Sequence, residues 1–179
     1  MDRQTGGQEP DEDGHDVRAL ACTIVLRRLA MAPRTRQELA QRLAERGIPE
    51  HVSQEVLDRF TELGYVDDVA FAQGWVESRH RSKALARSVI RGELRRRGIE
   101  DEVAHEALLQ ISPEQEAVRA TGYAKRKAER LAGVDREVAL RRISSALMRR
   151  GFHWSVALSA AQEALDGASE YGVGHNKGS

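Results

Sequence analysis

Apolar residues recur along most of this chain at spacings of three and four residues, and no stretch alternates apolar and polar residues as a half-buried strand would. That spacing places the apolar side chains on one face of an α-helix. The turn signals MAPRT, ELGYVDD, RSKA, QISPE and LAGVD interrupt it. The pattern therefore predicts an all-α protein. The expected helices span residues 17–31, 36–46, 50–63, 68–81, 84–97, 101–110, 113–131, 136–150 and 154–166.

Two of the expected helix starts carry capping boxes. Thr35 is followed three residues later by Glu38, and Ser112 is followed by Pro113 and Gln115. In a capping box the first side chain accepts a hydrogen bond from the backbone N–H of the third helical residue, whose own side chain bonds back. Proline also suits the first helical position. These residues support helix starts at 36 and 113.

Three helix ends share one outline, in the segments RLAERGIPEHV, ELRRRGIEDEV and ALMRRGFHWSV. Their glycines, Gly47, Gly98 and Gly151, are 51 and 53 residues apart, and apolar residues recur at positions −8, −4, +1, +5 and +9 from each. Glycine adopts positive φ without the penalty of about 1–2 kcal/mol that a side chain brings. The apolar residues at −4 and +1 are the pair that meets in a Schellman cap. The three glycines are therefore predicted to be structural caps.

A single copy of this outline would mark no more than a helix end, but three aligned copies predict an internal repeat. We expect three tandem three-helix repeats, over residues 17–66, 67–111 and 112–166. Each repeat is too small to bury its apolar face alone, so neighbouring repeats are expected to stack into an elongated, curved array. The acidic segment 1–16 and the glycine-rich segment 167–179 are expected to be disordered tails.

Composition excludes several classes of protein. No apolar run approaches the roughly 20 residues that a membrane-spanning helix needs, and the first residues, MDRQTGGQEPDEDGHD, lack the basic and apolar parts of a signal peptide. The one cysteine, Cys22, excludes an internal disulfide and is typical of a reducing compartment. It lies in the apolar segment LACTIVL and is expected to be a buried core thiol. We therefore expect a cytoplasmic protein without a membrane partner.

Catalytic chemistry is not indicated by any motif. The glycines form neither GxGxxG nor GxxxxGK[ST], and the six histidines lie far apart without metal-ligand spacing. Acidic pairs such as Asp67-Asp68 and Glu100-Asp101 fall at expected helix starts, where capping and the helix dipole account for them. The expectation is a protein that is not an enzyme and has no cofactor and no metal.

Basic residues are the more informative set, because the net charge of zero conceals an asymmetry. Residues 17–166 hold 26 Lys and Arg against 21 Asp and Glu, and the segment from Arg79 to Arg97 holds eight basic residues and one acidic residue. Arg87, Arg91 and Arg95 are four apart and so share one helical face. Such a patch marks an anionic partner or a solvated face. We assign a basic ridge to Arg81, Lys83, Arg87, Arg91, Arg95, Arg96 and Arg97.

The sequence contains two further basic clusters that are candidates for binding a partner. The second cluster consists of Lys125, Arg126, Lys127 and Arg130, for which a partner and a solvated face are equally expected. The third cluster consists of Arg141, Arg142, Arg149 and Arg150, and we interpret it as a solvated face.

Phe71, Trp75 and Val76 have the spacing of residues that share one helical face, and they are expected to be buried in the core. Trp154 is expected in the core rather than as an exposed anchor.

The segments TRQELAQRLAERGI, LGYVDDVAFAQGWVESR and ELRRRGI together resemble the RecX family, bacterial regulators of the recombinase RecA, and the resemblance covers roughly residues 17–166. It implies three tandem three-helix repeats and a non-enzymatic regulator. One departure is RSKALAR, residues 81–87, where many relatives have a glycine in the turn. The acidic tail also lies outside the shared pattern.

What the resemblance implies about function is specific. RecX-like proteins bind the RecA nucleoprotein filament on single-stranded DNA, lodge in its groove, and restrain its ATPase, strand-exchange and coprotease activities. They thereby limit homologous recombination, a route of DNA repair, and the SOS response. A monomer is expected by analogy. The basic ridge, with the second cluster behind it, is assigned as the contact surface from charge alone.

Two alternatives stay open. The chain could be a helical nucleic-acid-binding protein that acts independently of RecA and contacts single-stranded or duplex DNA through phosphates. The helix–turn–helix motif, however, normally occurs once per domain with a turn of about three residues. It could also be a helical scaffold for an acidic protein, indifferent to DNA. Affinity for bare DNA and its salt dependence distinguish these readings.

Overall fold

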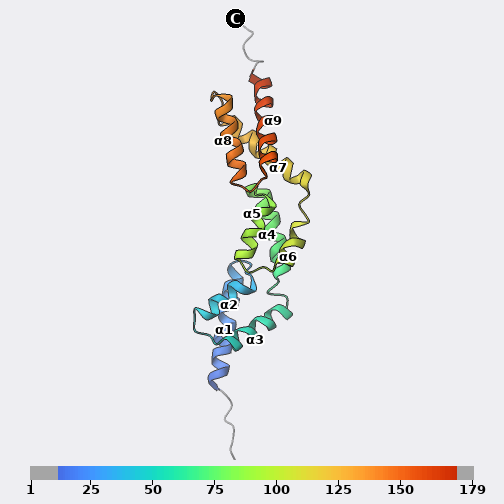
Figure 1. Cartoon of the computed structure of the whole chain (residues 1–179). Coiled ribbons are helices and arrows are strands. Elements are labelled where there is room, and N and C mark those ends of the chain that lie inside the picture. The colour runs from blue at the N-terminus through green and yellow to red at the C-terminus, as the bar shows by residue number, and fades with distance from the viewer. Residues whose placement is uncertain (1–11, 173–179) are drawn as a thin grey trace, which may run out of the picture. The chain divides into compact units, whose positions relative to one another are not determined.

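The computed structural model describes residues 12–172, and the side chains of residues 14–167. Within those residues every regular element is an α-helix, so the predicted all-α fold is confirmed (Figure 1). The helices are α1 (Glu12–Met31), α2 (Arg36–Ala44), α3 (Glu50–Glu62), α4 (Asp68–Lys83), α5 (Arg87–Arg96), α6 (Asp101–Leu108), α7 (Pro113–Glu129), α8 (Arg136–Met148) and α9 (Trp154–Gly172). Seven of these nine helices begin at the predicted residue.

The two predicted tails were wrong at their inner boundaries. Helix α1 begins at Glu12 and α9 continues to Gly172, so residues 12–16 and 167–172 are helical. Acidic residues in a first turn are favoured by the helix dipole. A single glycine such as Gly167 costs only about 1 kcal/mol relative to alanine, which does not end a helix. The remaining parts of the predicted tails, residues 1–11 and 173–179, lie outside the described residues.

Helix α5 begins at Arg87 and not at residue 84, because the chain turns sharply before it. Ala84 has φ of 48° and is the one non-glycine residue with positive φ that the described part of the chain contains. This left-handed conformation costs a residue with a Cβ about 1–2 kcal/mol. It falls inside RSKALAR, the segment in which the family resemblance leads one to expect a glycine.

The described chain divides into two compact units, of residues 12–71 with 97–99 and of residues 72–96 with 100–172. The core of the first unit joins α1, α2 and α3. It consists of Ala21, Val25, Leu39, Leu43, Ile48, Val52, Val56, Leu57, Phe60 and Val66. Fully burying a leucine such as Leu43 contributes about 1.5–3 kcal/mol, so the few large side chains carry much of this unit's stability.

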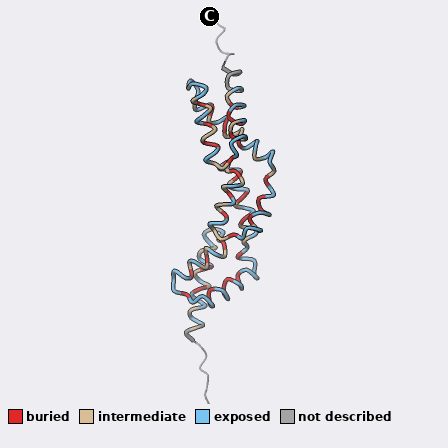
Figure 2. The backbone as a smooth tube through the Cα atoms, in the orientation of Figure 1, coloured by how far each residue is buried: buried red, intermediate tan, exposed pale blue. Residues whose placement is uncertain are grey.

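The largest core of the second unit joins α7, α8 and α9 and is rich in alanine. It consists of Ala86, Ala120, Ala124, Ala128, Ile143, Leu147, Phe152, Ala157, Ala160, Ala161 and Ala164. In Figure 2 the buried positions recur along each helix, as the period of three and four predicts. Because three buried alanines line α7 at intervals of four, its opposite face is left for longer, polar side chains.

The three repeated corners are turns with glycine at positive φ. Gly47, Gly98 and Gly151 have φ of 73°, 79° and 86°. After α2 the Ile48 N–H donates to the Leu43 carbonyl at 3.1 Å, and after α8 the Phe152 N–H donates to the Leu147 carbonyl at 3.3 Å. These are the long-range bonds of a Schellman cap. The turns at Gly47 and Gly151 are thus fixed by local hydrogen bonds.

Candidate anion-binding surface

Helix α5 presents the central arginines of the basic ridge and is anchored by apolar residues beside them. Ile90 and Leu94 are completely buried in the second unit, which fixes the orientation of the helix. Arg87, Arg91 and Arg95 are between 40% and 66% exposed. The spacing of four therefore gives an exposed row of guanidinium groups, as the sequence predicts.

Carboxylates pair with all three of these arginines. The Arg87 Nε lies 3.3 Å from Glu116 Oε2, and the Arg87 backbone N–H donates to Glu116 Oε1 at 2.9 Å. Arg95 Nη2 donates to both oxygens of Asp101 at 3.0 Å, and Arg91 Nη2 lies 3.6 Å from Asp101 Oδ1. The row is therefore partly neutralised, which the sequence did not reveal.

The pairs around Asp101 are weak because they are exposed. The hydrogen bond from Arg95 lowers the pKa of Asp101 from its ordinary value of 3.8, with the charges of Arg95 and Arg91 adding to it. A depressed pKa means that the contribution to stability is present above the unfolded pKa and is lost as the pH falls through the folded pKa. At neutral pH the pairs are formed, but solvent screens exposed pairs, so they contribute little to stability. An incoming anion can displace them.

Other members of the predicted ridge lie in different surroundings. Arg81 pairs with Glu77 at 2.9 Å and is 69% exposed. Lys83 and Arg96 are exposed, and neither pairs with a carboxylate among the described side chains. The seven predicted residues therefore do not form one uniform row of unpaired cations.

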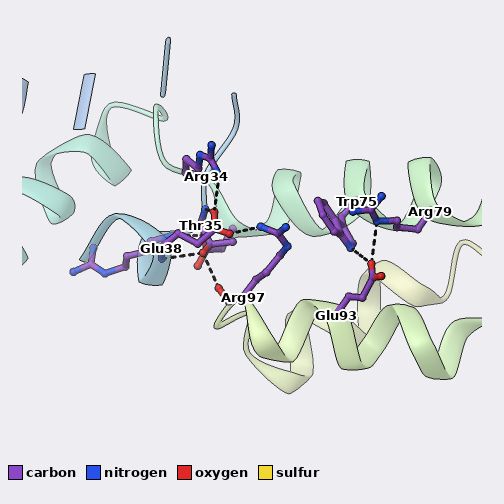
Figure 3. A network of polar contacts seen from close by, with 9 residues as sticks. Arg34, Thr35, Glu38, Trp75, Arg79, Glu93 and Arg97 are labelled. Atoms are coloured by element: carbon purple, nitrogen blue, oxygen red, sulfur yellow. Dashed lines mark hydrogen bonds and ion pairs between the residues drawn. The ribbon is translucent and has the colours of Figure 1, made fainter. Parts of the chain in front are cut away.

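Arg97 belongs to a network within the first unit (Figure 3). Its guanidinium pairs with Glu38 and lies 5.9 Å from the centre of the Phe71 ring. Its carbonyl accepts a hydrogen bond from the hydroxyl of Thr35, at 2.7 Å. With its side chain 30% exposed, Arg97 has internal partners for both backbone and side chain. We therefore interpret Arg97 as a structural residue.

A separate network in the second unit uses the acidic residue of the basic segment (Figure 3). Glu93 Oε2 accepts hydrogen bonds from Trp75 Nε1 at 2.9 Å and from Arg79 Nε at 3.0 Å. The guanidinium carbon of Arg79 lies 3.9 Å from the centre of the Trp75 ring. Trp75 is therefore half-buried and covered on one face, while Val76 beside it is completely buried.

The second basic cluster joins Lys83 around a pocket in the second unit. The pocket has a volume of about 340 Å³. Its charged lining residues are Lys83, Arg126, Lys127, Arg130 and Arg150. Lys125, predicted with this cluster, is not among them and pairs with Glu163 at 3.3 Å. Sequence spacing indicated the cations of α7, but not that the end of α4 would bring Lys83 to them.

Two expectations near this surface were wrong. Arg150 is not a solvated residue, because its guanidinium lies 4.2 Å from the centre of the Tyr123 ring and donates to the Lys83 carbonyl. Trp154 is not in the core, because it is 60% exposed. Phe152, two residues earlier, takes the buried place at the corner with 4% exposed. A third expectation, that Cys22 is a buried core thiol, is met only in part, since Cys22 is half-buried against the first core.

Neither a metal site nor a membrane-spanning helix is found among the residues that the structure describes. They contain no group of three or more His, Cys, Asp or Glu side chains that could hold a metal ion. None of their helices is sufficiently long and apolar to span a bilayer.

Helical modules closed by glycine caps, with exposed arginines and a cationic pocket, define an all-helical protein with basic surfaces. Comparison with known proteins gives the family. The RecX first and second three-helix domains match residues 21–60 and 67–108. Regulatory protein RecX of Streptomyces coelicolor is 40% identical over 168 residues, covering 94% of this chain and 87% of that protein. The chain belongs to the RecX family.

Further relatives agree with this membership and with the fold. Regulatory protein RecX of Thermobifida fusca is 39% identical over 169 residues, covering 92% of this chain and 91% of that protein. The crystal structure of RecX from Lactobacillus salivarius superposes with a TM-score of 0.75 at 22% identity, covering 84% of this chain and 97% of that chain. A second RecX crystal structure gives a TM-score of 0.73 at 26% identity, covering 84% of this chain and 78% of that chain. The resemblance seen in the sequence is confirmed, and the division into three repeats in an elongated array stays a prediction.

Proposed function

We propose that this protein is a non-enzymatic regulator of RecA that acts in the cytoplasm as a monomer. It binds in the groove of the RecA filament on single-stranded DNA and restrains ATPase, strand-exchange and SOS coprotease activity. The observation that carries the proposal is membership of the RecX family over 94% of the chain. The helices supply surface cations and, in the described residues, no metal-ligand cluster that would suggest catalysis instead.

The electrostatics of α5 suit such a partner. A nucleoprotein filament offers DNA phosphates and protein carboxylates, both of which accept bidentate hydrogen bonds from arginine. The exposed pairs of Arg87, Arg91 and Arg95 are weak enough to be exchanged for these groups. In the free protein, Asp101 and Glu116 hold the guanidinium groups in an ordered row.

The test is the DNA-dependent ATPase of RecA, titrated with wild type and with the triple variant Arg87→Glu, Arg91→Glu, Arg95→Glu at two salt concentrations. Loss of about 1–2 kcal/mol of interface electrostatics requires about 5- to 30-fold more variant for equal inhibition. The matched control reverses three exposed arginines of the third cluster, Arg141, Arg142 and Arg149, with the same change in net charge. It is expected to inhibit like wild type.

The outcomes distinguish an error in the proposed contact surface from an error in the proposed function. A triple variant with native circular dichroism that inhibits at wild-type concentrations would exclude α5 as the contact. A wild-type protein that leaves the ATPase of RecA unchanged would reject the proposed function itself.

Asp101→Asn gives a test in the opposite direction. It removes the carboxylate that holds Arg91 and Arg95, so both guanidinium groups become available to the filament. Because the lost pairs are exposed and weak, we expect inhibition at a concentration only about two- to fivefold lower. Glu102→Gln, at an exposed neighbouring position for which no arginine pair is found, is the control for lost negative charge. Equal effects of the two substitutions would show that only net charge matters.

A further inference from the structure

We propose that the pocket lined by Lys83, Arg126, Lys127, Arg130 and Arg150 is a binding site for the phosphodiester backbone of single-stranded DNA, and that it binds DNA without RecA. The site is distinct from the row of arginines on α5. The proposal goes beyond the proposed function, since it assigns an independent DNA affinity to the ends of α4, α7 and α8.

The chain builds the pocket from three helix ends. Lys83 ends α4, and Arg126, Lys127 and Arg130 occupy the last turn of α7 and its cap. The buried alanines of α7, among them Ala124 at 0% exposed, turn the basic residues outward. Arg150 also lines the pocket, and its carbonyl accepts the Ala86 N–H at 3.0 Å. The end of α8 is thereby fixed to the turn between α4 and α5.

These cations exceed what the helix ends require. Basic residues at helix C-termini offset the negative end of the dipole, which is equivalent to about −0.5 charge per helix. Three helix ends therefore account for about −1.5 against five positive side chains, which leaves a surplus of about +3.5. Arg150 already serves this purpose by donating to the Lys83 carbonyl. The surplus leaves cations available for an anion from outside.

The pocket also differs from the other basic surfaces in lacking carboxylates. Among residues 14–167, Lys83, Arg126, Lys127 and Arg130 have no ion pair, whereas Arg87, Arg91, Arg95 and Lys125 each have one. No acidic residue contributes to the lining. The turn beside it contains Ala84, whose positive φ of 48° is a strained conformation. Residues with a strained backbone are common at ligand-binding sites, where the surrounding structure holds them in that conformation.

The lining favours a polyanion over a small nucleotide or an acidic peptide. Tyr123 has one face covered by Arg150, so the pocket has no open ring on which a base could be held between two surfaces. Ala84 is only 5% exposed and Leu85 is half-buried, so the apolar part of the lining is small beside its five cations. Recognition therefore rests on phosphates, and a chain of phosphates gains several contacts with release of counterions.

The experiment measures binding of a fluorescent oligothymidylate by anisotropy, without RecA, over a fourfold range of salt. With four cations on phosphates at about −0.7 log units each, wild-type affinity falls about 50-fold over this range. The variant Arg126→Gln, Lys127→Gln, Arg130→Gln retains one such contact and is expected to fall only about threefold, from a weaker starting affinity. Arg141→Gln, Arg142→Gln, Arg149→Gln removes the same charge outside the pocket and is expected to keep the wild-type slope.

Competitors identify the anion. Unlabelled single-stranded DNA is expected to displace the probe, with inorganic phosphate, ATP and polyglutamate ineffective at equal charge concentration. The proposal is overturned if the pocket variant keeps the wild-type affinity and slope. It is equally overturned if ATP or phosphate competes as well as DNA, or if polyglutamate does, which would make the pocket a small-ligand or acidic-protein site. The same variants in the RecA ATPase assay show separately whether the proposed regulation stands.

Discussion

Gly151→Ala is expected to destabilise the second unit by about 3 kcal/mol, because two penalties add. Gly151 has φ of 86°, a conformation that costs a side chain about 1–2 kcal/mol. A Cβ there would also lie 2.5 Å from Val89 Cγ2 and 2.7 Å from Ser88 Oγ. Forcing atoms into a packed site costs typically about 1–3 kcal/mol. At about 2–4 °C per kcal/mol for a chain of this size, the melting temperature falls by about 6–12 °C.

The matched control is Gly133→Ala in the same unit. Gly133 has φ of 83°, but no atom lies within 4 Å of the position of its Cβ. It therefore isolates the backbone penalty, and the expected cost is about 1–2 kcal/mol. Both tryptophans, Trp75 and Trp154, belong to the second unit, so urea unfolding followed by tryptophan fluorescence reports on the unit in which both substitutions lie. Equal losses for the two variants would show that Val89 and Ser88 move aside freely.

These glycines show where prediction from sequence succeeds and where it ends. The aligned corners predicted positive φ at Gly47, Gly98 and Gly151, because a glycine between two apolar residues is a local signal. The sequence contains no local signal for the contacts that enclose two of them. Val89 lies 62 positions before Gly151, and Gln37 crowds Gly98 from a helix start 61 positions earlier. Gly47 has nothing within 4 Å, although its local sequence has the same outline.

The candidate site likewise combines features that the sequence predicts with features that it does not. Spacing alone placed Arg87, Arg91 and Arg95 on one exposed face, and it indicated the cations of α7. It did not predict that Glu116, 29 positions away, would pair with Arg87. Nor did it bring Lys83 and Arg150 together, because hydrogen bonds between helix ends 67 positions apart depend on how the helices pack. Helical faces follow from local periodicity, whereas charge neutralisation is a tertiary property.

Arg97 is the clearest case, and it leads to a prediction about Thr35. The arginine was placed in the ridge by its neighbours in sequence, yet its carbonyl and guanidinium both contact the start of α2. Thr35 is completely buried there, and its hydroxyl accepts from the Glu38 N–H at 3.2 Å while donating to the Arg97 carbonyl at 2.7 Å. The sequence predicted the first bond as part of a capping box, but not the second.

Thr35→Ala is therefore expected to cost the first unit about 3 kcal/mol. Loss of the cap accounts for about 1 kcal/mol. A partly buried Arg97 carbonyl left without its donor accounts for about 1–3 kcal/mol more. The measurement is urea unfolding followed by circular dichroism at 222 nm, a wavelength at which helices absorb, with hydrogen exchange of the α2 amides identifying the unit that opens.

Two variants separate these contributions. Ser112→Ala removes the same capping box from α7, where the hydroxyl makes no bond to a distant carbonyl, and is expected to cost about 1 kcal/mol. Thr35→Ser keeps the hydroxyl and loses one methyl group, which predicts a loss of about 1 kcal/mol. If Thr35→Ala were no worse than Ser112→Ala, the bond to Arg97 would contribute nothing. The position of Arg97 would then depend on the contacts of its guanidinium with Glu38 and Phe71 alone.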